Sequence, residues 1–135
     1  MGASPSRKRI VLDQQFGSGT PTNWYIGLAL ILPGADGTGW TEVPFTAGYA
    51  RVLVANTVGN WPAATSLAEV ASKKNANKIT FPNPSGSWGN IVGWLAFLAS
   101  TGGAPEFWAQ DDTIIGPKNG NTPVEFDVNQ LIATL

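Results

Sequence analysis

The chain has 135 residues, a net charge of −1 at pH 7, and neither cysteine nor histidine. This length allows one domain with a sizeable core. The absence of cysteine excludes disulfides and thiolate metal sites, and the small negative net charge argues against nucleic acid as the main partner. With 16 glycines, 10 prolines and only 13% charged residues, the composition is typical of an all-β domain with a largely neutral surface.

A short helix is predicted near the start of the chain. Ser4 or Ser6 can cap it, and Pro5 is tolerated in a first turn. The apolar pattern ends at Phe16, and Gly17 follows it as glycine commonly follows a helix C-terminus. We therefore expect two to three helical turns that end near Phe16.

Three consecutive cations, Arg7, Lys8 and Arg9, lie in this predicted helix. Three charges would bind phosphate only weakly, so we do not expect nucleic acid as their partner. We expect this basic cluster to attach the protein to an acidic surface of another protein. In the alternative interpretation, the helix caps one end of the β-rich domain and its charges face solvent.

Short strands separated by turn residues are predicted for most of the remaining chain. The clearest is NWYIGLALIL at 23–32, in which Gly27 suggests a bulge or a close approach of another backbone. Residues 57–77 are compatible with either a helix or a long polar loop. The other strand segments are 41–43, 48–54, 78–82, 89–100, 106–110, 111–115, 122–128 and 131–135, and a turn at Gly102 and Gly103 makes a hairpin of 89–100 and 106–110.

About eight short strands at spacings near ten residues predict a β-sandwich or a small barrel. We expect an all-β, single-domain fold in which residues 1–16 form an N-terminal arm with a short helix and residues 17–135 form the β-rich domain. The apolar run at 24–32 is far shorter than the roughly 20 residues that a membrane-spanning helix needs. No signal-peptide core follows the basic cluster, so we expect no export by the usual secretory route.

Few side chains are available for chemistry. Without histidine or cysteine, a serine triad, the usual proton shuttle and soft metal ligands are missing. Asp111 and Asp112 are predicted strand neighbours that point to opposite faces, and nothing in the spacing of Glu106 and Asp111 selects them as a glycosidase pair. Asp36 lacks the ligand spacing of a calcium loop, and turn acids usually bind backbone amides. We expect no enzymatic activity, no cofactor and no metal.

Six tryptophans make up much of the aromatic content. Trp24 and Trp94 lie within apolar strands, so we expect both in the core. Trp40, Trp61 and Trp88 lie beside glycine or proline at loop positions, where we expect them to be exposed. Exposed tryptophans anchor subunit interfaces or stack on sugars, so we assign these three to a subunit interface while a glycan-binding surface stays open as an alternative.

Arg51 lies in the predicted strand 48–54 among apolar residues. Burying an arginine without a partner is very costly, so the side chain needs a carboxylate or a carbonyl group beside it. We therefore expect Arg51 to have a structural role.

The order of the motifs resembles that of a known family. A helix that ends in FG is followed by a YxGL strand at Tyr25 to Leu28, TEVPFTAGYAR at Thr41 to Arg51, ITFPNPSGSWG at Ile79 to Gly89, and a strand with Phe107 and Trp108. Over about Ile10 to Leu135, this order resembles a family of small virion proteins of tailed bacteriophages. Its members are often labelled tail-fibre proteins, and some look like capsid cement or decoration proteins.

The resemblance implies a β-rich structural component of the virion without catalytic activity. Because the chain has no room for a separate shaft-forming region, we expect a capsid cement protein, made in the cytoplasm of the bacterial host, that binds the major capsid protein on the outer surface of the head and stabilises it. Decoration proteins often sit at local threefold positions, so we expect a homotrimer. The alternative is a tail-fibre or receptor-binding component that binds carbohydrate.

Overall fold

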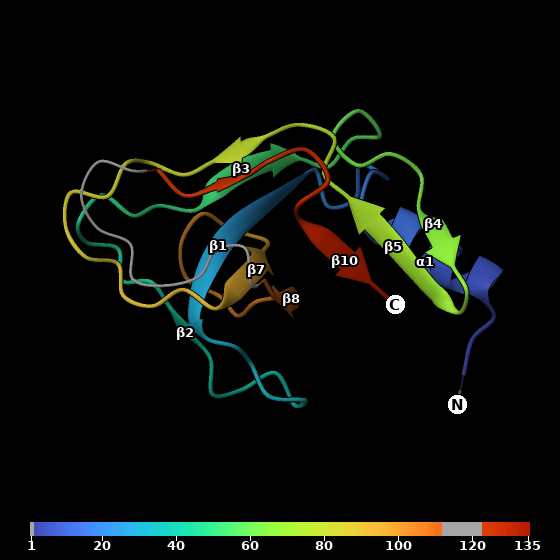
Figure 1. Cartoon of the computed structure of the whole chain (residues 1–135), viewed down its shortest axis with the longest axis horizontal. Coiled ribbons are helices and arrows are strands. Elements are labelled where there is room, and N and C mark those ends of the chain that lie inside the picture. The colour runs from blue at the N-terminus through green and yellow to red at the C-terminus, as the bar shows by residue number, and fades with distance from the viewer. Residues whose placement is uncertain (1, 112–122) are drawn as a thin grey trace. The chain divides into compact units, whose positions relative to one another are not determined.

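The structure of the protein is a computed structural model that describes residues 2–111 and 123–135. These residues form one helix and the strands β1 to β10, which are arranged in antiparallel sheets (Figure 1). The predicted all-β class with an N-terminal helix is confirmed. Asp112 and nearly all of the strand predicted at 111–115 lie outside the described residues.

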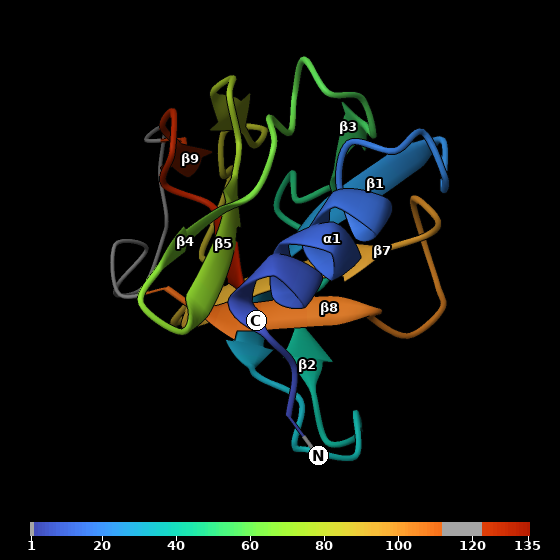
Figure 2. The same cartoon turned by 90° about the vertical axis from the view of Figure 1, so that its right-hand side faces the viewer.

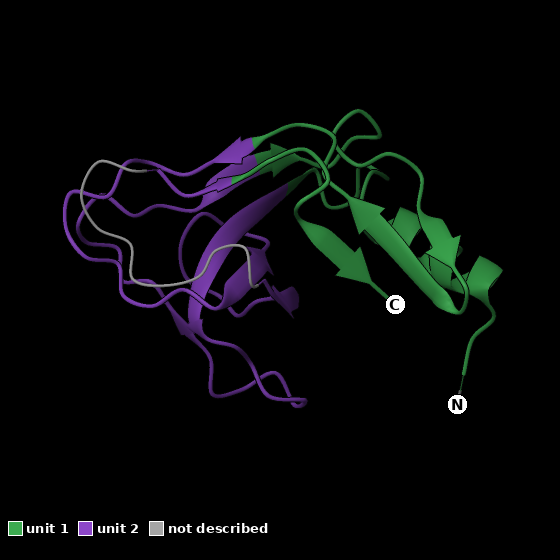
Figure 3. Cartoon of the chain, in the orientation of Figure 1, with its two compact units in different colours: residues 1–23, 54–78, 126–135 green, residues 24–53, 79–125 purple. Residues whose placement is uncertain are grey.

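The chain divides into two compact units (Figure 3). Unit 1 comprises Met1–Asn23, Val54–Lys78 and Phe126–Leu135, and unit 2 comprises Trp24–Leu53 and Ile79–Glu125. Each unit therefore combines segments that are far apart in the sequence. The predicted boundary between residues 16 and 17 does not coincide with a boundary of either unit, because the N-terminal helix is packed within unit 1.

The helix of unit 1 is α1 (Pro5–Gln15). Ser4 is its N-cap, and the Ser4 hydroxyl accepts a hydrogen bond from the backbone N–H of Arg7 at 3.2 Å. Gly17 follows the helix with a φ of +96°, a conformation that glycine adopts without a steric penalty. The cap and the glycine thus set the two ends of the helix where the sequence predicts them.

Three strands complete the regular structure of unit 1. They are β4 (Thr65–Leu67), β5 (Val70–Lys74) and β10 (Ile132–Thr134), in the order β10-β5-β4. The helix α1 packs against β5 and β4 (Figure 2). In β5, Ala71 and Lys73 are buried on the face toward α1, because successive side chains of a strand point to opposite faces.

Residues 57–77 contain a β-hairpin that the sequence does not predict. Strands β4 and β5 pair around a two-residue turn, with Leu67 opposite Val70. The first turn residue, Ala68, has a φ of +54°. The buried positions of β5 hold an alanine and a lysine, so the alternation of apolar and polar residues that marks a half-buried strand is missing.

Unit 2 is built around a five-stranded sheet. Its strands β1 (Asn23–Ile31), β2 (Thr41–Glu42), β7 (Gly93–Phe97) and β8 (Phe107–Gln110) follow the order β2-β1-β7-β8. The fifth strand, β3 (Val52–Ala55), pairs with β1, and its last two residues belong to unit 1. The whole of β7 is buried, and β7 and β8 form the predicted hairpin. At Gly27 in β1, a Cβ atom would come within 2.7 Å of Glu42 Oε2 and 2.9 Å of the Tyr49 hydroxyl, so the predicted close approach involves side chains and requires glycine.

The core of unit 2 is aromatic. Trp24 and Trp94 are each only 1% exposed, and the ring of Trp24 meets Phe107 edge-on with 5.5 Å between ring centroids. The remaining short strands, β6 (Ile79–Thr80) and β9 (Glu125–Phe126), pair with each other. Most of the aromatic side chains are therefore buried in the core and do not form a binding surface.

Candidate attachment surface

The basic helix α1 is fixed to the β4–β5 hairpin by three polar contacts within unit 1. Lys73 Nζ donates to Asp13 Oδ1 at 2.7 Å, and the Lys73 side chain is only 3% exposed. Lys8 Nζ donates to the backbone carbonyl of Glu69 at 2.9 Å, and the Arg9 guanidinium donates to the Ser66 hydroxyl. The helix is consequently an integral part of unit 1.

The Asp13 carboxyl is the acceptor at the centre of this contact. Burial alone would raise its pKa, but the hydrogen bond from Lys73, the backbone N–H of Ala64 and the positive charges of Lys73 and Arg9 together hold the pKa below its ordinary value. Asp13 is therefore ionised at neutral pH and provides the counter-charge that the buried Lys73 needs.

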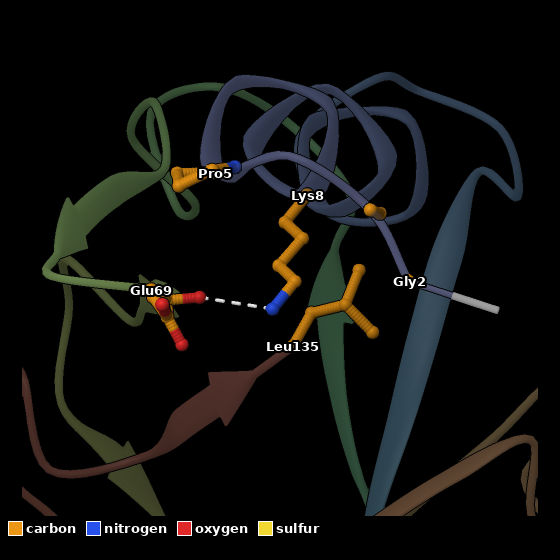
Figure 4. A pocket seen from close by; sticks show the side chains of 6 residues that line it. Gly2, Pro5, Lys8, Glu69 and Leu135 are labelled. Atoms are coloured by element: carbon orange, nitrogen blue, oxygen red, sulfur yellow. Dashed lines mark hydrogen bonds between the residues drawn. The ribbon is translucent and has the colours of Figure 1, made fainter.

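A pocket of about 660 Å³ lies beside the first turn of α1. It is lined by Gly2, Ala3, Pro5, Lys8, Glu69 and Leu135. Figure 4 shows the Lys8 side chain reaching from the helix to the Glu69 carbonyl, with the Leu135 side chain next to it. The pocket thus combines apolar walls with the ammonium group of Lys8 and the carboxylate of Glu69, which suits an apolar side chain of a partner with polar or charged neighbours.

The three predicted attachment residues differ in how they are presented. Arg7 is exposed, whereas Lys8 and Arg9 are half-buried in their contacts with the hairpin. Glu69 and Leu135 of the pocket are not predicted from the sequence. Both come from segments more than 60 residues away from Lys8, and only the fold brings them to the helix.

Arg51 has the carboxylate partner that its burial requires. Its Nε and one terminal nitrogen form a two-point ion pair with Glu42, with donor–acceptor distances of 2.8 and 2.7 Å. The other terminal nitrogen donates to the carbonyl oxygens of Ala99 and Gly102, and the guanidinium lies 3.4 Å from the centroid of the Phe97 ring. One side chain thus joins β2 to the loop between β7 and β8.

Tyr49 extends this buried network. Its hydroxyl donates to Glu42 Oε2 at 2.6 Å and accepts from the backbone N–H of Leu28 at 3.0 Å. Burial, together with the hydrogen bond and charge of Glu42, raises the pKa of Tyr49 far above its ordinary value. The phenol therefore stays protonated and acts as a structural hydrogen-bond donor.

The predicted exposure of the loop tryptophans is wrong for two of the three. Trp61 is 0% and Trp88 2% exposed, and the Trp88 indole donates to the carbonyl of Ala47 at 2.8 Å. Trp61 packs against Phe16 with ring centroids 5.1 Å apart. Trp40 is half-buried against Phe97. Glycine and proline neighbours bend the chain here without turning the large rings to solvent, so Trp61 and Trp88 offer no surface for a subunit or a sugar.

The acidic side chains form no metal-binding constellation in the described part of the chain. Asp36 accepts from the backbone N–H and the hydroxyl of Thr38, which lower the pKa of its carboxyl, as expected for a turn acid. Residues 2–111 and 123–135 contain no group of three or more side chains that could hold a metal ion. Nor does any helix in these ranges have the length and apolar character needed to cross a membrane.

Comparison with known proteins agrees with the motif order. No curated protein matches the chain. The family described as podophage GP4 fiber I protein gp80 matches residues 6–134, which include nearly all of α1 and every strand from β1 to β10. The match confirms the resemblance to small virion proteins of tailed phages. The chain belongs to the podophage GP4 fiber I protein gp80 family and is a structural protein of a phage virion.

Proposed function

We propose that the protein is a component of a podophage tail fibre, rather than the capsid cement protein expected from the sequence. The observation that carries this proposal is the family match over residues 6–134, because that family is described by a fibre protein. The interpretation as a cement protein used the basic N-terminal segment as an arm held by the capsid. Within unit 1, α1 instead packs against the hairpin of its own chain.

The pocket beside α1, together with Arg7 and Lys8, is the surface through which the proposed component would bind the virion. The pocket beside α1 would receive an apolar side chain of the neighbouring virion protein, while Arg7 and Lys8 face acidic groups around it. Opposite charges would steer the two proteins into register before the apolar contact forms. The partner is thus a virion protein whose contact surface has an apolar side chain surrounded by acidic groups.

The role is structural rather than catalytic or sugar-binding. The chain has no histidine or cysteine for acid–base or nucleophilic chemistry. The burial of Trp61 and Trp88 removes the stacking platform on which glycan recognition would rest. We also propose that identical subunits assemble into a closed ring, of which the homotrimer expected from the sequence is one form.

Electron microscopy of virions labelled with gold-conjugated antibodies against this protein tests the location. Label along the tail fibres is the expected result, and label distributed over the head would restore the capsid cement interpretation. A virion carrying Arg7→Glu should incorporate less of the protein than one carrying Val58→Ser, which alters an exposed residue away from the pocket. Equal incorporation of the two variants would show that the α1 surface has no attachment role.

A further inference from the structure

The sheet β10-β5-β4 has a second face, opposite α1. In β5, Val70, Ser72 and Lys74 alternate with the buried Ala71 and Lys73 and therefore point away from the helix. The pairing register adds their neighbours from β4 and β10 to the same face. We call this the open face, and its residues are Thr65, Leu67, Val70, Ser72, Lys74, Ile132 and Thr134.

The open face is unusually apolar for a solvent-exposed surface. Leu67 is 85%, Val70 50% and Ile132 38% exposed. Leu67 and Val70 are cross-strand partners, so their side chains lie next to each other at the end of the hairpin. Adjacent apolar side chains exposed to this degree on one sheet face are typical of a protein–protein contact.

A recess of about 220 Å³ adjoins these apolar residues. It is lined by Pro62, Ala63, Thr65, Ser72, Lys74 and Asn129. The Thr65 and Ser72 hydroxyls are 3.5 Å apart, and Lys74 forms no ion pair with the residues that the structure describes. An ammonium group beside hydroxyl groups is suited to an incoming carboxylate.

The chain itself contains a complementary charge. Unit 1 has six Lys and Arg against three Asp and Glu, a net charge of +3, while unit 2 has two against six, a net charge of −4. These two values add to the −1 of the whole chain. Asp112 and Lys118, which lie outside the described residues, cancel each other in unit 2. An acidic partner for unit 1 is therefore available on a second copy of the same chain.

One loop of unit 2 presents both an apolar and an acidic side chain. In the segment between β7 and β8, residues 98–106 are all exposed except Pro105. Leu98 is 54% exposed, and the Glu106 carboxylate has no hydrogen bond or ion pair within the described residues. By contrast, the carboxylates of Glu42 and Asp36 are engaged by Arg51 and Thr38, respectively.

We propose that the open face of unit 1 binds the β7–β8 loop of a second copy of the chain. The partner subunit's Glu106 enters the recess and pairs with Lys74, and the partner subunit's Leu98 packs on Leu67 and Val70. The two surfaces are different, so the contact is heterologous, and repeated contacts close a ring, such as the proposed trimer, or build a chain. This inference rests on the proposed self-association.

The contact is tested by reversing the charges of Lys74 and Glu106. Light scattering coupled to size-exclusion chromatography then measures the mass of each variant over a range of protein concentrations. Lys74→Glu and Glu106→Lys should each weaken self-association roughly tenfold or more, because each places like charges in the recess. The double variant, Lys74→Glu with Glu106→Lys, should associate about as well as the original protein, since it restores an opposite pair. Lys78→Glu makes the same charge change outside the open face and the recess, and should leave association unaltered.

A matched pair of variants tests the apolar part of the contact. Leu67→Ser should weaken association, whereas Val58→Ser, at another exposed apolar position of unit 1, should not. Circular dichroism verifies that each variant is folded before its mass is measured. Raising the salt concentration should also weaken association of the original protein.

Two results would overturn the proposal in distinguishable ways. If the original protein remains a monomer at low salt and high concentration, and virions carry isolated single copies, self-association itself fails. If the original protein associates but the single and double charge variants associate equally well, self-association uses another surface. Failure of either kind leaves the location on the fibre to be decided by the labelled virions.

Discussion

Arg51 illustrates how a single residue can organise a loop in a domain with few charges. Its side chain and that of Glu42 are 2% and 7% exposed, so neither group has water to replace its partner. The two carbonyl groups that Arg51 also binds belong to the exposed segment after β7. Without the guanidinium, that segment would lose its main polar connection to β2.

Replacing Arg51 with methionine should lower the free energy of unfolding by about 3–5 kcal/mol, because the substitution leaves Glu42 buried without a counter-charge. Urea denaturation followed by tryptophan fluorescence measures this change. Arg7→Met removes an exposed cation and should change stability by no more than about 0.5 kcal/mol. Equal denaturation midpoints for the two variants would mean that the Arg51 pair contributes nothing to stability.

At the scale of elements, the contact between α1 and β5 depends on the ion pair between Asp13 and Lys73. The folded state lowers the pKa of Asp13, so this group stabilises the fold at pH values above its ordinary pKa of 3.8. As the pH falls through and below that value, the native carboxylate becomes protonated and the stabilisation is lost.

Asp13→Asn should therefore destabilise the protein at pH 7 and have little effect near pH 2. We expect a loss of about 1–2 kcal/mol at pH 7, a modest value because the Asp13 side chain is 42% exposed to water. Thermal melts at both pH values measure the difference. A difference in melting temperature between the variant and the original protein that stays constant from pH 7 to pH 2 would contradict the proposed role of the charge.

At the scale of the whole molecule, the opposite net charges of the two units are the basis of the proposed assembly. Unit 1 has a net charge of +3 and unit 2 a net charge of −4, so the two units differ in sign. We expect no hydrolysis of polysaccharide or peptidoglycan by the purified protein in a reducing-sugar assay. Turnover that Glu106→Gln abolishes, while Glu69→Gln leaves it intact, would identify an enzyme instead.

The sequence alone determined the features that depend on neighbours along the chain. The cap at Ser4 and the glycine at position 17 set the ends of α1, and the apolar run at 23–32 became β1. The motif order identified a phage virion protein, which the family match confirmed. The cap, the glycine and the apolar run are local signals, because each acts within a few residues, whereas the motif order is read along the whole chain.

Only the tertiary structure decided the features that depend on distant residues. The β4–β5 hairpin has a buried lysine, whose position becomes favourable only when Asp13 of α1 is beside it. Trp61 and Trp88 have the local surroundings of exposed loop residues, yet contacts with Phe16 and Ala47 bury them. Long-range partners of this kind set burial and charge compensation, and no pattern within a short window of sequence reports them.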